Sequence, residues 1–203
     1  MEKHIKIIGI TGKAGSGKDT VANYFVSSKN YIQLTFGGAV KDIVQIITGW
    51  PREMIEGQTP ESRNLRETIV HPNYNMTCRQ LMQFVGTDLF RNNLDPNIWV
   101  NIVHDKIKKI ISDGNGNENG NGNGNIRGII VSDVRFDNEA QFIKSIGGII
   151  IKINRGSVDN ANSGHQSERG ISIECEYIVE NNNTIDELYN QIDYIIYDMK
   201  YKK

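Results

Sequence analysis

Residues 12–20 read GKAGSGKDT and lie between an apolar stretch, residues 5–10, and a segment with helical composition, residues 18–28. The apolar stretch is short and runs into glycines, which indicates a buried strand and excludes both a signal segment and a membrane span. A strand, a glycine-rich turn and a helix in this order bring free backbone N–H groups to the helix start, where phosphate binds. The stretch therefore predicts a phosphate-binding loop.

Within this loop the glycines permit close backbone approach, and Lys18 would reach the β- and γ-phosphates of a nucleotide. The general pattern has Ser or Thr directly after the lysine, whereas here Asp19 intervenes and the hydroxyl comes at Thr20. This Lys-x-Thr order is similar to the variant seen in nucleotide kinases. The loop alone would suit a kinase, a GTPase switch or a motor, but a guanine-reading NKxD is absent and no long second half suited to a motor follows. The candidate nucleotide-binding residues are Gly15, Ser16, Gly17, Lys18, Asp19 and Thr20.

The rest of the chain alternates between apolar strands and amphipathic helices, with one polar excursion at residues 51–74. Continuously apolar strands separated by helices predict an α/β protein whose parallel sheet is covered on both faces. Thr184 and Glu187 form a capping-box pattern at the start of the last helix. The expected strands are 5–10, 31–36, 129–131 and 148–153; the expected helices are 18–28, 40–48, 77–85, one from Trp99 to Ile110, 136–145 and 184–199, with a short one at 61–70.

Charge and cysteine content limit the protein's class. The 203 residues carry 23 Lys and Arg against 24 Asp and Glu, so no broad basic surface for nucleic acid is expected. These totals are compatible with a local basic cleft. Cys78 and Cys175 show no spacing typical of zinc sites or disulfides, which favours a reducing, cytoplasmic setting without a membrane.

Gly and Asn are abundant, with 20 and 23 residues, and 11 of them lie in residues 114–125. That stretch has no apolar side chain and cannot bury anything, so it predicts a flexible insertion between a helix and a strand of a single domain, residues 1–203. A partner-binding role for the stretch is the alternative to a neutral spacer.

Several blocks together resemble the phage-type deoxynucleoside monophosphate kinases. Beside the loop at 12–20, these are 37–42 (GGAVKD), 79–91 (RQLMQFVGTDLFR), 95–100 (DPNIWV), 131–139 (VSDVRFDNE), 147–155 and 165–168 (HQSE). The resemblance implies a three-layer P-loop kinase fold with a central parallel sheet and a lid at residues 156–170. It also implies transfer of phosphate from ATP, with Mg²⁺, to a deoxynucleoside monophosphate of the dTMP, dGMP or dCMP type, and it leaves a homodimer open.

The chemistry of that reaction indicates which residue types the site needs. The acceptor is already a phosphate anion, so catalysis reduces to positioning and to neutralising charge on the transferred group. Lys18, Arg79 and Arg135 are the catalytic candidates, and Thr20 and Asp133 are the candidates for holding Mg²⁺. His165, Ser167 and Glu168 are the expected lid residues. The expected substrate-binding residues are Val40, Lys41, Arg63, Arg79, Gln83, Gly86, Thr87, Trp99, Asp133, Arg135 and Glu139.

Plainer interpretations stand beside these. Arg135 and Asp133 could form an ordinary surface ion pair, Trp99 could be a core residue, and residues 156–170 could be a solvated loop. At the level of function, the alternatives are a phosphomevalonate or dephospho-coenzyme A type of kinase, or a non-catalytic nucleotide-binding regulator.

Overall fold

The computed structural model describes residues 5–113, 126–156 and 165–201. The chain divides into two compact units. Unit 1 comprises Met1–Thr35, Val103–Gly164 and Glu168–Lys203, and unit 2 comprises Phe36–Ile102 and His165–Ser167. The predicted insertion at 114–125, and residues 157–164 of the predicted lid, lie outside the described residues.

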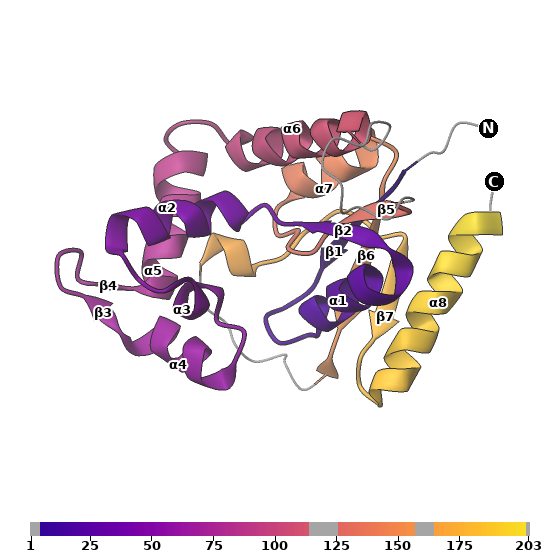
Figure 1. Cartoon of the computed structure of the whole chain (residues 1–203), viewed down its shortest axis with the longest axis horizontal. Coiled ribbons are helices and arrows are strands. Elements are labelled where there is room, and N and C mark those ends of the chain that lie inside the picture. The colour runs from indigo at the N-terminus through magenta and orange to yellow at the C-terminus, as the bar shows by residue number, and fades with distance from the viewer. Residues whose placement is uncertain (1–4, 114–125, 157–164, 202–203) are drawn as a thin grey trace. The chain divides into compact units, whose positions relative to one another are not determined.

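Unit 1 is built on a five-stranded sheet with the order β2-β5-β1-β6-β7 (Figure 1). All neighbouring strands run parallel, and the central strand β1 pairs Gly9 with Val131 on one side and with Ile150 on the other. The strands are rich in isoleucine and valine, as expected of strands buried on both faces. Their bounds are β1 Lys6–Thr11, β2 Tyr31–Leu34, β5 Gly128–Val131, β6 Ile149–Asn154 and β7 Tyr177–Glu180.

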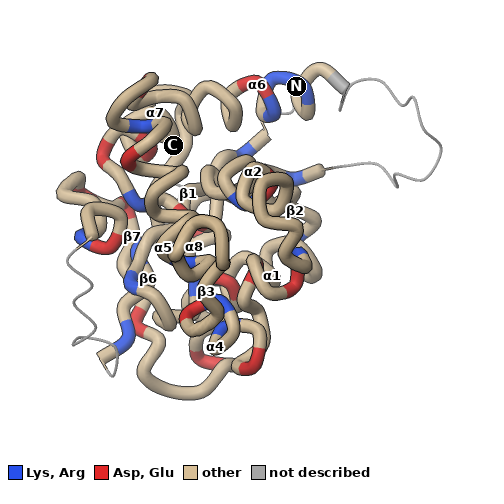
Figure 2. The backbone as a smooth tube through the Cα atoms, turned by 90° about the vertical axis from the view of Figure 1, so that its left-hand side faces the viewer, with Lys and Arg blue, Asp and Glu red and all other residues tan. Residues whose placement is uncertain are grey.

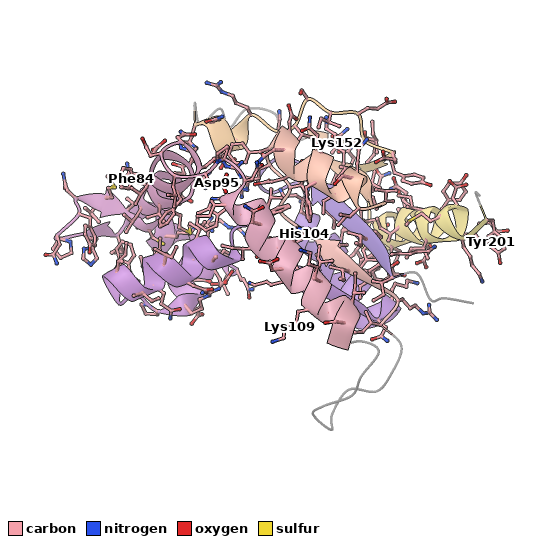
Figure 3. All side chains as sticks on the ribbon, turned by 90° about the horizontal axis from the view of Figure 1, so that it is seen from above. Phe84, Asp95, His104, Lys109, Lys152 and Tyr201 are labelled. Atoms are coloured by element: carbon pink, nitrogen blue, oxygen red, sulfur yellow. The ribbon has the colours of Figure 1, made fainter. Side chains whose placement is uncertain are left out.

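Helices cover both faces of this sheet. On one face, α1 (Lys18–Lys29) and α8 (Ile185–Tyr201) bury an apolar cluster against β1, β5, β6 and β7. On the other face, α7 (Asp137–Ser145) packs on β1 and β6. In the unit 1 part of α6 (Ile98–Asp113) lies His104, which Figure 3 labels. Its ring meets that of Phe142 on α7, with centroids 5.2 Å apart. The predicted three layers are confirmed.

The carboxyl ends of the five parallel strands meet at one edge of the sheet, where ligands of open α/β sheets bind. The loop from Gly12 to Gly17 follows β1 there, and the segment after β5 is tied to the same place because Val134 N–H donates to the carbonyl of Ile10 (3.0 Å). After β7, Asn181 N–H donates to the carbonyl of Asn154 at the end of β6 (2.8 Å). Segments that are far apart in the sequence therefore meet at this edge of the sheet.

Unit 2 is mainly helical. Its elements are α2 Gly38–Thr48, α3 Arg52–Glu56, α4 Pro60–Thr68, the hairpin strands β3 Val70–His71 and β4 Met76–Thr77, α5 Cys78–Gln83, a π-helix Phe84–Arg91 and the start of α6. Capping boxes begin α4 at Thr59 and α5 at Thr77. Acidic and basic residues share α4 (Figure 2), where Glu67 approaches Arg66 to 3.5 Å.

The sequence predictions were right for the long, periodic elements and incomplete elsewhere. Thr184 begins the last helix as expected, because its hydroxyl accepts from Glu187 N–H (3.3 Å). Ile185, the first residue of that helix, is 52% exposed, so the apolar face of the helix is formed by Leu188, Ile192 and Ile195. Strand β7, helix α3 and the β3–β4 hairpin were not predicted, and the helix expected to end at Val85 continues as a π-helix. No helix in the described ranges combines the length and apolar character that crossing a membrane requires.

The α1 side of the core supplies a stability test. Phe25 is fully buried and meets the ring of Tyr31 edge-on, with centroids 5.0 Å apart. We expect Phe25→Ala to lower the free energy of unfolding by about 3–5 kcal/mol, because it leaves a cavity in the core. Val26→Ala, at the next position of the same helix but 40% exposed, should cost less than about 1 kcal/mol. Urea denaturation followed by circular dichroism measures both, and equal costs would contradict this view of the core.

Candidate active site

The loop between β1 and α1 has the backbone conformation that a phosphate site needs. Gly12, Gly15 and Gly17 all have positive φ angles, 148°, 78° and 102°. A Cβ atom on Gly12 would collide with the carbonyl oxygen of Ile153 on β6, so only glycine lets the loop lie this close to the sheet. Gly17 precedes α1 without a side-chain cap, and the first N–H groups of the helix have no partners within the helix. The N–H groups of the first turn and the positive end of the helix dipole therefore lie at the loop.

Lys18, the first residue of α1, folds back over this loop. Its ammonium group donates to the carbonyls of Gly12 (2.7 Å) and Lys13 (2.6 Å). Burial, helped by the nearby positive charge of Arg135, lowers the pKa of Lys18 to about 8, while Asp19, Glu168 and Asp133 oppose the shift. The charged form of Lys18 is therefore destabilised in this site, and a bound anion would stabilise it.

Ser16 gives a second sign that this loop is shaped for a ligand. The residue is 1% exposed, and its hydroxyl has no hydrogen-bond partner in the described part of the chain. A buried hydroxyl without a partner costs free energy that a bound acceptor can recover. Together with the free N–H groups and Lys18, this hydroxyl fits the oxygens of a polyphosphate.

The segment after β5 brings a second cation to the same unit. Arg135 lies close enough to Lys18 to lower its pKa, and its guanidinium is 3.2 Å from the carboxylate of Glu168. The backbone here is fixed by Glu139, whose carboxylate accepts from the N–H groups of Arg135 (2.8 Å) and Phe136 (3.2 Å). Glu139 is 2% exposed, and in this arrangement it caps α7 and fixes the backbone at Arg135.

The described part of the predicted lid contributes to both units. In unit 1, Glu168 pairs with Arg135. The plainer interpretation of Arg135, as part of a surface ion pair, had expected Asp133 as its partner. In unit 2, Ser167 N–H donates to Nδ1 of His165 (3.2 Å), and the Ser167 hydroxyl lies 2.8 Å from the same nitrogen. These contacts form a turn around the short 3₁₀ helix Gln166–Glu168.

Three of the four cations predicted to bind the acceptor belong to unit 2, whereas Arg135 belongs to unit 1. Two of the three are paired with carboxylates there. Arg79 donates to Glu67 (3.0 Å), and Lys41 forms an ion pair with Glu56. Arg52 bridges Glu56 (2.8 Å) and Asp42. Lys41 and Arg52 hold the pKa of Glu56 below its usual range against the opposing effect of its own burial. Arg63, on α4, is exposed. The carboxylates Glu56 and Glu67 were not predicted, since nothing in their local sequence marks them.

The remaining predicted substrate residues of unit 2 gather around the π-helix, a form often found at functional sites. Thr87 is 4% exposed, and Trp99, 3% exposed, donates its indole N–H to the carbonyl of Gly86 (2.7 Å). Gly86 packs against Val40. These contacts favour the core interpretation of Trp99 over stacking on a base. Gln83, the last residue of α5, directly precedes the π-helix and is half-buried.

The site residues also indicate how a metal would be held. Among the described residues, no group of three or more His, Cys, Asp and Glu side chains could hold a metal ion. Thr20, in the first turn of α1, and Asp133, near Lys18, offer single oxygen ligands. Such a set suits Mg²⁺, which takes one or two protein oxygens together with phosphate oxygens and water.

Unit 1 thus combines a parallel sheet with a phosphate loop, a half-buried lysine and a nearby arginine, the features that define a P-loop phosphotransferase. The family model described as "Deoxynucleotide monophosphate kinase" matches residues 51–192. The chain belongs to this family and is a kinase.

Individual relatives agree with the family assignment. The chain is 33% identical over 191 residues to a protein of Acanthamoeba polyphaga mimivirus provisionally named deoxynucleotide monophosphate kinase, covering 92% of this chain and 93% of that one. It is 23% identical to the deoxynucleotide monophosphate kinase of Enterobacteria phage T4, over 93% of this chain and 97% of the other. A crystal structure of a provisionally assigned kinase from Chloroflexus aurantiacus matches the whole chain with a TM-score of 0.50 and 11% identity, which supports the fold alone.

Glu139 gives a test that separates positioning from substrate contact. Glu139→Gln keeps an oxygen that can accept from both backbone N–H groups, so we expect most stability and activity to remain. Glu139→Ala leaves the two N–H groups without an acceptor and should lower the free energy of unfolding by about 2–3 kcal/mol. Thermal denaturation and steady-state kinetics of both variants measure this, with Gln141→Ala on the exposed side of α7 as the control. A large loss of activity in a stable Glu139→Gln enzyme would instead indicate that the carboxylate contacts substrate.

Proposed function

We propose that this kinase transfers the γ-phosphoryl group of ATP to the phosphate of a deoxynucleoside monophosphate of the dTMP, dGMP or dCMP type. The bond from the γ-phosphorus to the bridging oxygen breaks, and a bond forms from that phosphorus to an oxygen of the acceptor phosphate. The products are ADP and the deoxynucleoside diphosphate. Membership of the deoxynucleotide monophosphate kinase family supports this assignment.

One observation carries the proposal: two cations, Lys18 and Arg135, converge beside a loop of free N–H groups. The charge of Arg135 contributes to the lowered pKa of Lys18, which supports their closeness, and both residues belong to unit 1. Positive charge of this kind stabilises the charge that spreads over the oxygens of a phosphoryl group in transfer. Because the acceptor phosphate is itself the nucleophile, the reaction requires no group to remove a proton.

Each residue of unit 1 has a distinct part in this mechanism. The N–H groups at the start of α1 and the Ser16 hydroxyl bind the phosphates of the donor, and Lys18 exchanges the carbonyls of Gly12 and Lys13 for phosphate oxygens. Arg135 exchanges Glu168 for the group being transferred, to which a guanidinium can offer two N–H donors. Thr20 and Asp133 would hold Mg²⁺, which when bound neutralises the phosphates and orients them.

The residues of unit 2 are proposed to hold the acceptor. Arg79, Lys41 and Arg63 would bind its phosphate, with Arg79 also stabilising the charge in transfer. Gln83 would hydrogen-bond the base or sugar, whereas the buried Thr87 and Trp99 would shape the surrounding wall. The same π-helix region would set the choice among bases.

A coupled assay of ADP release tests the function directly. We expect turnover with ATP and Mg²⁺ that depends on one or more of dTMP, dGMP and dCMP. Turnover only with phosphomevalonate or dephospho-coenzyme A, or nucleotide binding without any turnover, would contradict the proposal in favour of the other kinases or of a regulator.

The lowered pKa of Lys18 predicts that ATP binding takes up a proton. In the free enzyme Lys18 titrates near pH 8, and bound phosphates would raise its pKa because they favour the ammonium form. Between the two pKa values the free enzyme lacks a proton that the complex holds. We therefore expect uptake of roughly half a proton or more at about pH 8.5 and almost none at about pH 6.5. The affinity for ATP should fall as the pH rises above about 8.

Isothermal titration calorimetry in two buffers of different ionisation enthalpy measures this uptake. Lys18→Met removes the titrating group and should abolish it, together with nearly all turnover. Lys13→Met, in the same loop, leaves Lys18 in place and should retain the uptake. Equal proton uptake in the wild type and in Lys18→Met would show that another group titrates.

A further inference from the structure

We propose that Asn181 is a positioning residue for the phosphoryl donor, which holds the loop of residues 12–18 in its phosphate-binding conformation. The inference rests on the proposed function. It concerns a residue that follows the last strand and lies outside every motif recognised in the sequence.

The side chain of Asn181 reaches the phosphate loop across 165 positions of sequence. Its amide Nδ2 donates to the carbonyl oxygen of Ser16 (2.8 Å). Its own backbone N–H donates to the carbonyl of Asn154 (2.8 Å), which fixes the residue to the end of β6. The side-chain amide is therefore anchored to the sheet and restrains the loop.

Peptide geometry links this contact to the orientation of an N–H group that would bind phosphate. In a trans peptide the C=O and the following N–H point in opposite directions. Because Asn181 fixes the carbonyl of Ser16, the N–H of Gly17 is aimed away from Asn181. That N–H is one of the group at the head of α1 that is available to an anion. Loss of the contact would let this peptide plane rotate.

Gly17 and Asn181 also fit each other sterically. A Cβ atom on Gly17 would collide with Nδ2 of Asn181, so the amide occupies the space that the glycine leaves. The φ angle of 102° at Gly17 requires glycine as well. This close packing adds a steric limit on loop movement to the hydrogen bond.

The end of β7 is held by other contacts, so the Asn181 side chain is not needed to keep the strand in place. Gln191 of α8 exchanges two hydrogen bonds with the backbone of Glu180, at 2.9 and 3.1 Å. Asn182 accepts from Gly156 N–H (2.7 Å), and Asn154 donates to the Glu180 carboxylate (3.0 Å). A change confined to the Asn181 side chain should therefore act on the loop rather than on the fold.

The test uses Asn181→Leu, which keeps the approximate volume but cannot donate, and Asn181→Asp, which also places a negative charge beside the loop. Equilibrium binding of MgATP is measured on the full chain without acceptor. We expect the dissociation constant to rise about tenfold in Asn181→Leu and further in Asn181→Asp. In turnover, KM for the deoxynucleoside monophosphate should change less than about twofold, and Tm should move by no more than about 2 °C.

Magnesium tripolyphosphate serves as a second probe, since it carries the phosphates without the base. It should lose affinity in the same proportion as ATP, because the contact acts on the phosphate loop. Asn183→Ala, two residues away on the exposed surface, is the matched control and should bind both probes as the wild type does.

Three results would overturn the proposal: MgATP binding by Asn181→Leu within twofold of the control, unchanged tripolyphosphate binding, or an equal loss of affinity for both substrates with a lowered Tm. The first would show no positioning, the second a contact to the base, and the third a general structural role. The binding measurements need no turnover, so a wild-type chain without kinase activity would count against the proposed function and still leave the role of Asn181 decided.

Discussion

The ammonium group of Lys18 is partly withdrawn from water, and the arrangement of the surrounding residues depends on that constraint. A buried cation is unfavourable unless acceptors surround it, and here the carbonyls of Gly12 and Lys13 supply them. Those carbonyls are available only because the loop turns through glycines with positive φ angles. Arg135 adds a repulsive charge, which Glu168, Asp133 and Asp19 offset. The site is thus organised around a half-buried ammonium group whose charged form is destabilised and which a bound phosphate would stabilise.

Carboxylate partners occur beside the expected phosphate-binding cations in both units. Arg135 pairs with Glu168, Arg79 with Glu67 and Lys41 with Glu56. These pairs are partly exposed, so each is worth little, less than about 1 kcal/mol. A phosphate dianion carries more negative charge than a carboxylate and, like a carboxylate, offers a guanidinium two oxygens at once. The carboxylates can therefore hold long side chains in one region at small cost and give them up to a phosphate.

The sequence predicted those parts of the fold whose cause is local. Buried strands such as residues 5–10 and helices with one apolar face carry their pattern within a few residues. Strand β7 does not, because it is a four-residue edge strand with Ile178 60% exposed, and its pairing with β6 is decided by tertiary contacts. The π-helix at 84–91 likewise has no periodic signal that distinguishes it from a longer α-helix.

The same distinction applies to the site. The phosphate loop is contiguous, so its glycines, lysine and hydroxyls could be predicted from nine residues of sequence. Glu139 was singled out, but its role as a cap for Arg135 appears only when the backbone N–H groups are placed. The pairing of Arg135 with Glu168 spans 33 positions, and that of Asn181 with Ser16 spans 165. Contacts of this kind follow from strand order, which brings the ends of β1, β5, β6 and β7 to one edge of the sheet.

Two independent lines of argument meet in the assignment of a kinase. The family match begins at residue 51 and ends at residue 192, so it contains most of the residues expected to bind the acceptor, though not Val40 and Lys41, and excludes the phosphate loop. The donor site is supported separately, by the geometry of residues 12–20, the buried Ser16 hydroxyl and the perturbed Lys18. A nucleotide-binding regulator would need only the second set of features, and it would leave Arg79 and the π-helix region without a role. A phosphotransferase acting on a phosphate acceptor needs both sets, because charge must be neutralised on the donor and on the acceptor alike.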